Sequence, residues 1–199
     1  MTTAALTALL PLLVLAGTVV ILLVVIAFYR HRSLVNALVL AGLVLALLSI
    51  LPASRVAPQP VTPLLLIDGY ALFYIGLLLI AAFVVAVLSH GYLHRQPGVQ
   101  EEYGVLLLLA TLGSAVLAAS VHFASFFLGL ELLSMSLYGL IAYPRHRGRS
   151  LEAGAKYLIL AAASSATLLF GMALAYADRG TLAFEGVVPG RVSLSGEPL

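Results

Sequence analysis

The sequence contains no cysteine and no tryptophan, and it carries little charge. The lack of cysteine excludes disulfides, thiolate zinc sites, cysteine-ligated iron–sulfur clusters and thiol nucleophiles. Only 9% of its 199 residues are charged and 62% are hydrophobic, whereas soluble domains carry roughly 25% charged residues. The mean hydropathy is +1.13. So few charged side chains cannot cover a water-facing surface, and the composition therefore predicts a polytopic membrane protein.

The sequence also lacks the features of proteins that bind nucleic acids or nucleotides. The formal net charge is only +2, and the basic residues are scattered instead of forming one stripe. No glycine-rich loop of the P-loop or dinucleotide-binding type is present. We therefore expect no nucleic-acid partner. If the protein works in a redox complex, we expect other subunits to hold the redox centres.

Six apolar segments are each about long enough to cross a bilayer as a helix, which takes about 20 residues. The links between them are short, except for a proline-rich stretch at residues 52–63 that we expect to be extended. Pro11 is expected to cause a small kink in the first helix. The predicted fold is an all-α bundle of six transmembrane helices at residues 5–29, 34–51, 69–89, 103–121, 123–143 and 151–177.

These segments divide the chain into four parts. Residues 1–68 hold the first two helices and an external proline-rich loop, and residues 69–102 hold the third helix and a cytoplasmic loop. Residues 103–177 hold helices four to six, and residues 178–199 form an external loop rich in glycine and proline. Because this last loop is followed by no closing element, we expect an N-terminal piece of a longer protein.

Glu131 is an acid in the middle of the fifth apolar segment, more than a helical turn from any loop. An ionisable group at a helix centre costs at least about 2.5–3.5 kcal/mol and usually marks a functional site. Ser134 and Tyr138 share its helical face. Two interpretations remain open: an acid that titrates in a hydrated interior, which we favour, and a neutral group that bonds a neighbouring helix as a packing contact.

Lys156 is the only lysine among ten Lys and Arg residues, and it lies near the start of the sixth segment. Glu152, four residues earlier, is well placed for an ion pair that anchors the helix end. Against this simple role, a buried lysine can lose its proton, whereas an arginine practically cannot. Thr167 shares the same face and is placed to help hydrate the ammonium group.

The depths of the two residues predict that they do not touch. Counted from the intervening loop, Glu131 is roughly 18 Å deep and Lys156 roughly 7–8 Å deep, at 1.5 Å per residue. An offset of about 10 Å is too large for a direct ion pair between neighbouring helices. Lys156 is therefore expected to pair with Glu152 or with water.

The histidines show no convincing metal-ligand pattern. His122 lies at the tight junction of the fourth and fifth segments, where it could pass protons or cap a chain reversal, and we favour capping. The other four histidines are expected at the membrane surface: His31, His90, His94 and His146.

Two stretches carry a resemblance to a known family. Residues 122–134 with 138–140, and residues 150–157 with 164–166 and 169–174, resemble the fifth- and sixth-helix signatures of antiporter-like membrane subunits. Residues 61–63 and 68–69 resemble the same family's approach to its third helix. Within that family the chain is most similar to the N-subunit branch of bacterial proton-translocating NADH:quinone oxidoreductase, respiratory complex I. The resemblance extends over residues 10–184.

The resemblance implies a fold of about fourteen helices, in which three N-terminal helices precede two inverted repeats of five. Glu131 would be the helix-five acid and Lys156 the helix-six lysine, both serving proton translocation driven by quinone reduction in other subunits. The partner lysine of Glu131 would lie on a seventh helix. The chain would bind no cofactor and would be a non-redox part of the enzyme, inactive alone.

The implied surroundings are those of a bacterial inner membrane. The partners would be the lipid bilayer and the other membrane-arm subunits, while NADH, FMN, iron–sulfur clusters and quinone would bind elsewhere in the complex. Two alternatives stay open. One is a subunit of a cation/proton antiporter or of a membrane-bound hydrogenase, and the other is a structural membrane fragment in which Glu131 and Lys156 only fix helix packing.

The distribution of arginine predicts the orientation in the membrane. Six arginines lie in the odd-numbered loops and three on the opposite side, so the odd loops are expected in the cytoplasm and the N-terminus in the periplasm. A phosphatase reporter fused between residues 145 and 149, which requires export for activity, should therefore be inactive. An active fusion at that loop would reverse the orientation.

Overall fold

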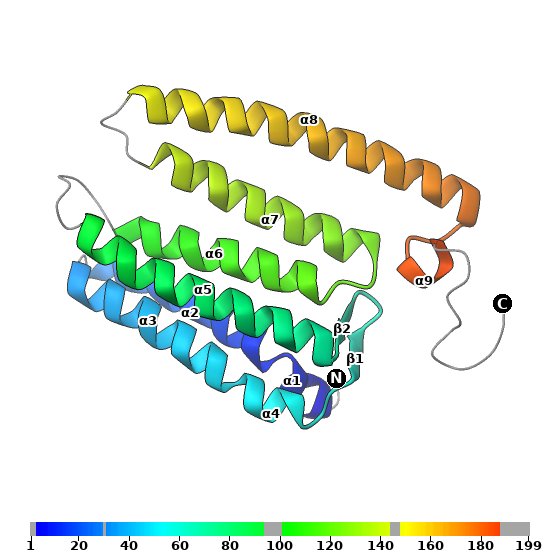
Figure 1. The fold of residues 1–199 in the computed structure, drawn as a ribbon, viewed down its shortest axis with the longest axis horizontal. Helices are drawn as coiled ribbons and strands as arrows, with labels where there is room; N and C mark the ends of the chain where they lie inside the picture. Colours follow the sequence, from blue (N-terminus) through cyan, green and yellow to red (C-terminus); the bar gives the residue numbers. More distant parts are fainter. Residues whose placement is uncertain (1–2, 30, 94–100, 144–147, 188–199) are drawn as a thin grey trace.

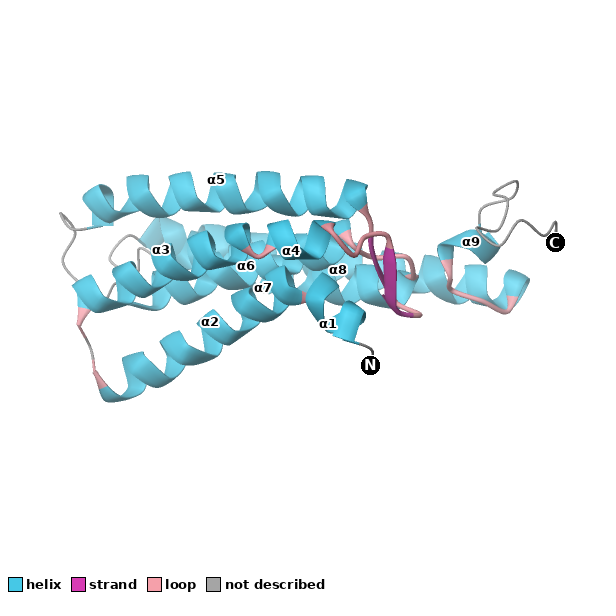
Figure 2. Ribbon diagram, turned by 90° about the horizontal axis from the view of Figure 1, so that it is seen from below, coloured by secondary structure: helices cyan, strands magenta, loops and turns pink. Residues whose placement is uncertain are grey.

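A computed structural model describes residues 3–29, 31–93, 101–143 and 148–187, and its helices lie roughly alongside one another (Figures 1 and 2). The predicted all-α membrane bundle is confirmed. Several residues used above for orientation or assigned to the membrane surface lie outside the described part: Arg30, His94, Arg95, Arg145, His146, Arg147 and Arg191.

Nine helices and one small hairpin make up the described residues. Five helical spans are long and apolar enough to cross a membrane, and the fourth expected segment, residues 103–121, corresponds to α6, a shorter apolar helix. The elements are α1 (Thr3–Ala8), α2 (Leu10–Phe28), α3 (Arg32–Leu48), α4 (Ile50–Ser54), β1 (Gln59–Thr62), β2 (Leu65–Ile67), α5 (Gly69–Leu93), α6 (Glu101–Ala118), α7 (Phe123–Ala142), α8 (Gly148–Arg179) and α9 (Phe184–Val187).

The first expected helix is divided at Leu9 into α1 and α2. Pro11 lies in the first turn of α2, where its missing N–H leaves the carbonyl four residues earlier without a helical partner. The expected kink is therefore present as a short break in the helix.

The proline-rich link is only partly extended, which corrects the expectation for residues 52–63. Pro52 belongs to the short helix α4, which continues the direction of α3 to Ser54. Proline is tolerated there because the first residues of a helix have no helical acceptor for their N–H groups. Extended backbone follows in β1, which pairs with β2 as an antiparallel hairpin.

The hairpin also explains why α6 ends at Ala118 and not near residue 121. Backbone groups just after α6 bond to the hairpin, since Leu66 N donates to Ala119 O at 2.9 Å and Val121 N to Leu64 O at 3.2 Å. On its other side the same segment bonds to the chain beyond α8, with Phe184 N donating to Val121 O at 3.0 Å. These bonds replace the helical ones and form a cap at one end of the bundle.

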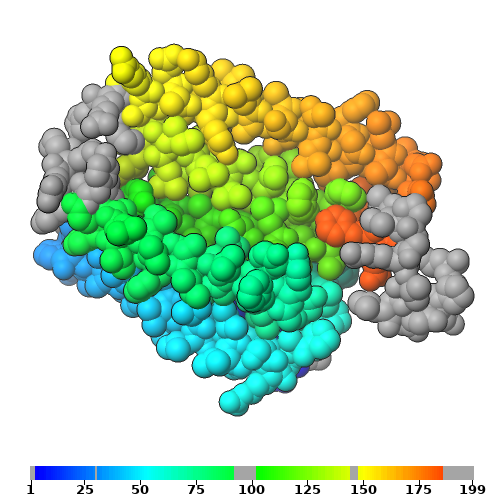
Figure 3. Space-filling model, viewed as in Figure 1, coloured from blue at the N-terminus to red at the C-terminus, as the bar shows by residue number. Residues whose placement is uncertain are grey.

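The core lies among α2, α3, α5 and α6, and α7 and α8 are layered outside it (Figure 1). Large side chains that are completely or almost completely buried include Leu22, Leu43, Ile75 and Leu108. In contrast, α8 buries only Gly154 and Met172, and it forms one edge of the molecule in Figure 3. Most of α8 is thus open to lipid or to further protein.

Two glycines allow α6 and α7 to approach closely. A Cβ atom on Gly113 would lie 2.7 Å from the backbone nitrogen of Leu133, and one on Gly129 would lie 3.0 Å from Gly113 O. Because the atoms in the way belong to the backbone, a larger side chain would have to push the two helices apart. Small residues serve close helix packing in membranes in this way.

We predict that Gly113→Ala destabilises the protein, by about 1–3 kcal/mol as is usual for overpacking. The measurement is the free energy of unfolding in detergent micelles. The control is Gly171→Ala in α8, where a Cβ atom would meet nothing within 4 Å, so the better helix propensity of alanine should leave stability unchanged or raised. Equal stability of the Gly113 variant and the wild type would show that the contact is not tight.

Candidate functional site

The start of α7 is fixed by contacts that connect it to the cap. His122 is extended, and its Nδ1 accepts a hydrogen bond from Ala124 N at 3.1 Å, so the predicted capping role is confirmed. The hydroxyl of Ser125 lies 2.7 Å from Leu64 O and 2.8 Å from His122 O, and its one proton is shared between these two acceptors. These bonds hold the first turn of α7 against the hairpin and so fix the height of every later residue in the helix.

The glycine contact then fixes which way Glu131 faces. Gly129 packs against α6, and a residue two positions later is rotated by about 200° around a helix of 3.6 residues per turn. Glu131 therefore points away from α6, toward the side on which α8 lies (Figure 1). The seam between α7 and α8 is the candidate functional site.

Glu131 is bonded across this seam by a serine of the next helix. The hydroxyl of Ser165 on α8 donates to Glu131 Oε1, and both residues are partly buried. The sequence placed Ser134 and Tyr138 on the face of Glu131, but within the described part of the chain the hydrogen bond to its carboxyl group comes from Ser165.

The sequence contains a signal for this partner that helical periodicity within one segment does not reveal. Ser165 is fourteen residues into the sixth segment, or roughly 21 Å deep at 1.5 Å per residue, close to the depth derived for Glu131. Two neighbouring serines, Ser164 and Ser165, interrupt an apolar stretch there. A comparison of depths between neighbouring helices, instead of faces within one helix, would have paired Glu131 with this position.

Lys156 is not part of the seam contact. Its Nζ lies 2.5 Å from Glu152 Oε1, and the two side chains are 70% and 62% exposed. The predicted pair with Glu152 is thus confirmed, and no ion pair joins Lys156 to Glu131, both of which are described. Nine residues separate Lys156 from Ser165, about 13–14 Å along α8. This separation agrees with the different depths predicted for Lys156 and Glu131.

Thr167 does not reach the lysine by a hydrogen bond. Its hydroxyl donates to Ala163 O, one turn back in its own helix, at 2.9 Å. Across the residues that the structure describes, no group of three or more His, Asp or Glu side chains could hold a metal ion. The site therefore consists of a carboxyl group and a hydroxyl group between apolar helices, an arrangement suited to holding or releasing a proton.

The comparisons with known proteins first show which family of membrane subunits the chain resembles. Residues 120–194 match the profile of the family described as NADH:quinone oxidoreductase/Mrp antiporter, TM, and this stretch includes Glu131, Lys156 and Ser165. The expected resemblance to antiporter-like membrane subunits is confirmed.

One curated relative narrows this resemblance from a family to a single subunit. The chain is 48% identical over 185 residues to NADH-quinone oxidoreductase subunit N of Ectopseudomonas mendocina, which covers 90% of this chain and 37% of the relative. The chain thus spans little more than a third of the length of that curated relative.

Two solved structures share the fold. Respiratory complex I from Thermus thermophilus matches with a TM-score of 0.77 and 32% identity, over 92% of this chain and 40% of the other. An archaeal membrane-bound sulfane sulfur reductase matches with a TM-score of 0.76 over 94% of this chain and 39% of the other, but at 24% identity it bears on the fold alone.

We predict that the vibrational band of the Glu131 carboxyl group depends on Ser165. The band is identified by infrared spectroscopy as the one lost in Glu131→Gln, and Ser165→Ala should shift it because a hydrogen bond to the group is removed. Ser164→Ala is the control, since that adjacent serine is exposed, and it should leave the band in place. An unshifted band in Ser165→Ala would contradict the seam contact.

Proposed function

We propose that this chain acts in the proton-translocating membrane part of an NADH:quinone oxidoreductase, respiratory complex I, with Glu131 as an acid that binds and releases protons. The observation that carries the proposal is an ionisable carboxyl group at the centre of an apolar helix seam, within the segment that matches the antiporter family. The identity with subunit N supports the choice of complex.

The chemistry of the seam suits such a role. A serine hydroxyl has one donor and two acceptor positions, so it donates to an ionised carboxylate and accepts from a protonated one. Glu131 can therefore change its charge without losing its contact with α8. In a medium of low dielectric constant, that change strongly affects the protonation of any nearby charged group, and two such groups titrate as a unit.

Lys156 has a role separate from that of Glu131. It takes up and passes protons near one end of α8, where Glu152 holds its charge, and it does not contact Glu131 directly. The group that exchanges charge with Glu131 is a lysine outside the 199 residues. NADH, FMN, iron–sulfur clusters and quinone belong to other subunits, and the complex lies in a bacterial inner membrane with the N-terminus of this chain in the periplasm.

The structural alternative makes use of the same hydrogen bond. If Glu131 only fixes packing, the Ser165 bond is its whole function, and any residue that preserves the bond preserves the protein. A cation/proton antiporter or hydrogenase subunit would use the acid in the same way but with a different source of energy.

We predict that Glu131→Gln, in an otherwise intact complex, reduces proton translocation severalfold while assembly is maintained. Glutamine retains the shape and can still accept from the Ser165 hydroxyl, but it cannot ionise. The measurement is proton uptake by membrane vesicles during NADH oxidation, with complex assembly followed on native gels. Wild-type translocation in this variant would leave only the packing role, and translocation that does not depend on NADH would favour an antiporter.

Lys156→Arg supplies the companion test in the same vesicles. Arginine keeps the positive charge and the pair with Glu152 but practically never releases its proton. Reduced translocation is expected if Lys156 handles protons. Unchanged translocation would assign it to anchoring the helix end.

A further inference from the structure

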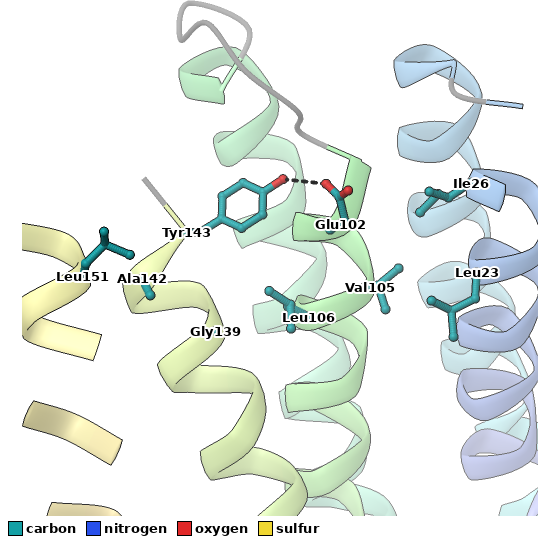
Figure 4. Close-up of a pocket in the computed structure, with 9 residues that line it drawn as sticks. All are labelled: Leu23, Ile26, Glu102, Val105, Leu106, Gly139, Ala142, Tyr143 and Leu151. Carbon is teal, nitrogen blue, oxygen red and sulfur yellow. Dashed lines mark hydrogen bonds between the residues drawn. The ribbon is translucent and has the colours of Figure 1, made fainter. Parts of the chain in front are cut away.

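A cavity of about 410 Å³ opens at the end of the bundle opposite the cap (Figure 4). It lies where α2 and α7 end and where α6 and α8 begin, so four helices contribute to its walls. Its volume is within the range of about 300–1,000 Å³ that is usual for ligand sites. The walls are almost entirely apolar and include Leu23, Ile26, Val105, Leu106 and Leu151.

The polar groups of the cavity are confined to one side. Figure 4 shows the Tyr143 ring directed toward Glu102, and its hydroxyl donates to Glu102 Oε2 at 3.4 Å. The ring of Tyr103 packs edge-on against that of Tyr143 with centroids 5.8 Å apart. The Glu102 carboxylate at this side of the cavity forms a subsite for a cation that carries hydrogen-bond donors, because a carboxylate only accepts hydrogen bonds.

The position of the cavity indicates where its ligand comes from. Spanning helices end at the level of the lipid headgroups, where tyrosine is enriched, and this cavity lies among four such ends with its apolar walls continuing into the bundle. An apolar wall beside the Glu102 carboxylate, at the level of the headgroups, fits a lipid whose headgroup carries a cation.

We propose that this cavity binds an aminophospholipid of the surrounding bilayer, phosphatidylethanolamine, with the ammonium group at Glu102 and an acyl chain against the apolar walls. The ammonium group offers three donors to the carboxylate, which the choline headgroup lacks. Phosphatidylglycerol offers no cation. A quinone is disfavoured because its ring oxygens are acceptors and would meet another acceptor in Glu102.

The test uses the chain in nanodiscs that contain a phosphatidylethanolamine with a photoreactive acyl chain. After illumination, mass spectrometry locates the label. We expect it on peptides that contain residues 102–106 and 151, and we expect unlabelled phosphatidylethanolamine to compete about tenfold better than phosphatidylcholine, the difference of one charge-assisted hydrogen bond. Labelling elsewhere, or equal competition by the two lipids, would overturn the proposal.

The variants separate the headgroup from the chain. Glu102→Gln should abolish the preference for phosphatidylethanolamine while labelling of the cavity persists, and Glu185→Gln, which removes an exposed carboxylate at the capped end, should leave the preference intact. Leu106→Trp, which fills the cavity, should lower the labelling itself. Retained preference in Glu102→Gln, or stronger competition by phosphatidylglycerol, would show that basic side chains select the headgroup instead.

Discussion

The close approach of α6 and α7 at Gly113 and Gly129 is the contact on which the candidate site depends. The backbones are near enough that a single added methyl group would collide with main-chain atoms. This contact fixes the rotation of α7 about its axis, and Glu131 is two residues beyond it. The acid therefore faces α8 because this glycine contact sets the rotation of α7, and no polar interaction is needed to turn it there.

The position of the acid along the helix is fixed separately from its rotation. The first turn of α7 is held to the hairpin through Ser125 and to its own start through His122. Rotation and height together place the carboxyl group beside Ser165, at mid-helix on α8. Two distant features of the chain, a glycine pair and a capped turn, thus produce one short contact between polar groups in an apolar seam.

Much of this could be predicted from the sequence, because a bilayer imposes a simple rule on length and polarity. The number and approximate limits of the apolar segments, the buried acid, and the separation of Glu131 from Lys156 all follow from counting residues. The partner Ser165 did not follow from the periodicity of a single helix, since periodicity relates residues within a helix and says nothing of the neighbouring one.

The ends of the helices could not be predicted by counting apolar residues along the chain. Residues 119–121 are apolar enough to continue α6, but their backbone groups bond to the hairpin and to the segment after α8. Pro52 likewise lies in a helix, because its place in the first turn of α4 requires no N–H donor. Both errors come from tertiary contacts that override a local preference.

The cap has a further consequence for biosynthesis. Its central segment, residues 119–123, forms hydrogen bonds on one side to the hairpin, which precedes it by more than fifty residues, and on the other to residues 182–184, which follow by about sixty. Contacts of such sequence separation form late in folding. One edge of the hairpin therefore stays unpaired until α5 and α6 have been inserted. The cap is completed only after α8 has crossed the membrane. A complete cap thus indicates that α8 has been inserted, which happens long after the core of α2, α3, α5 and α6 is able to assemble.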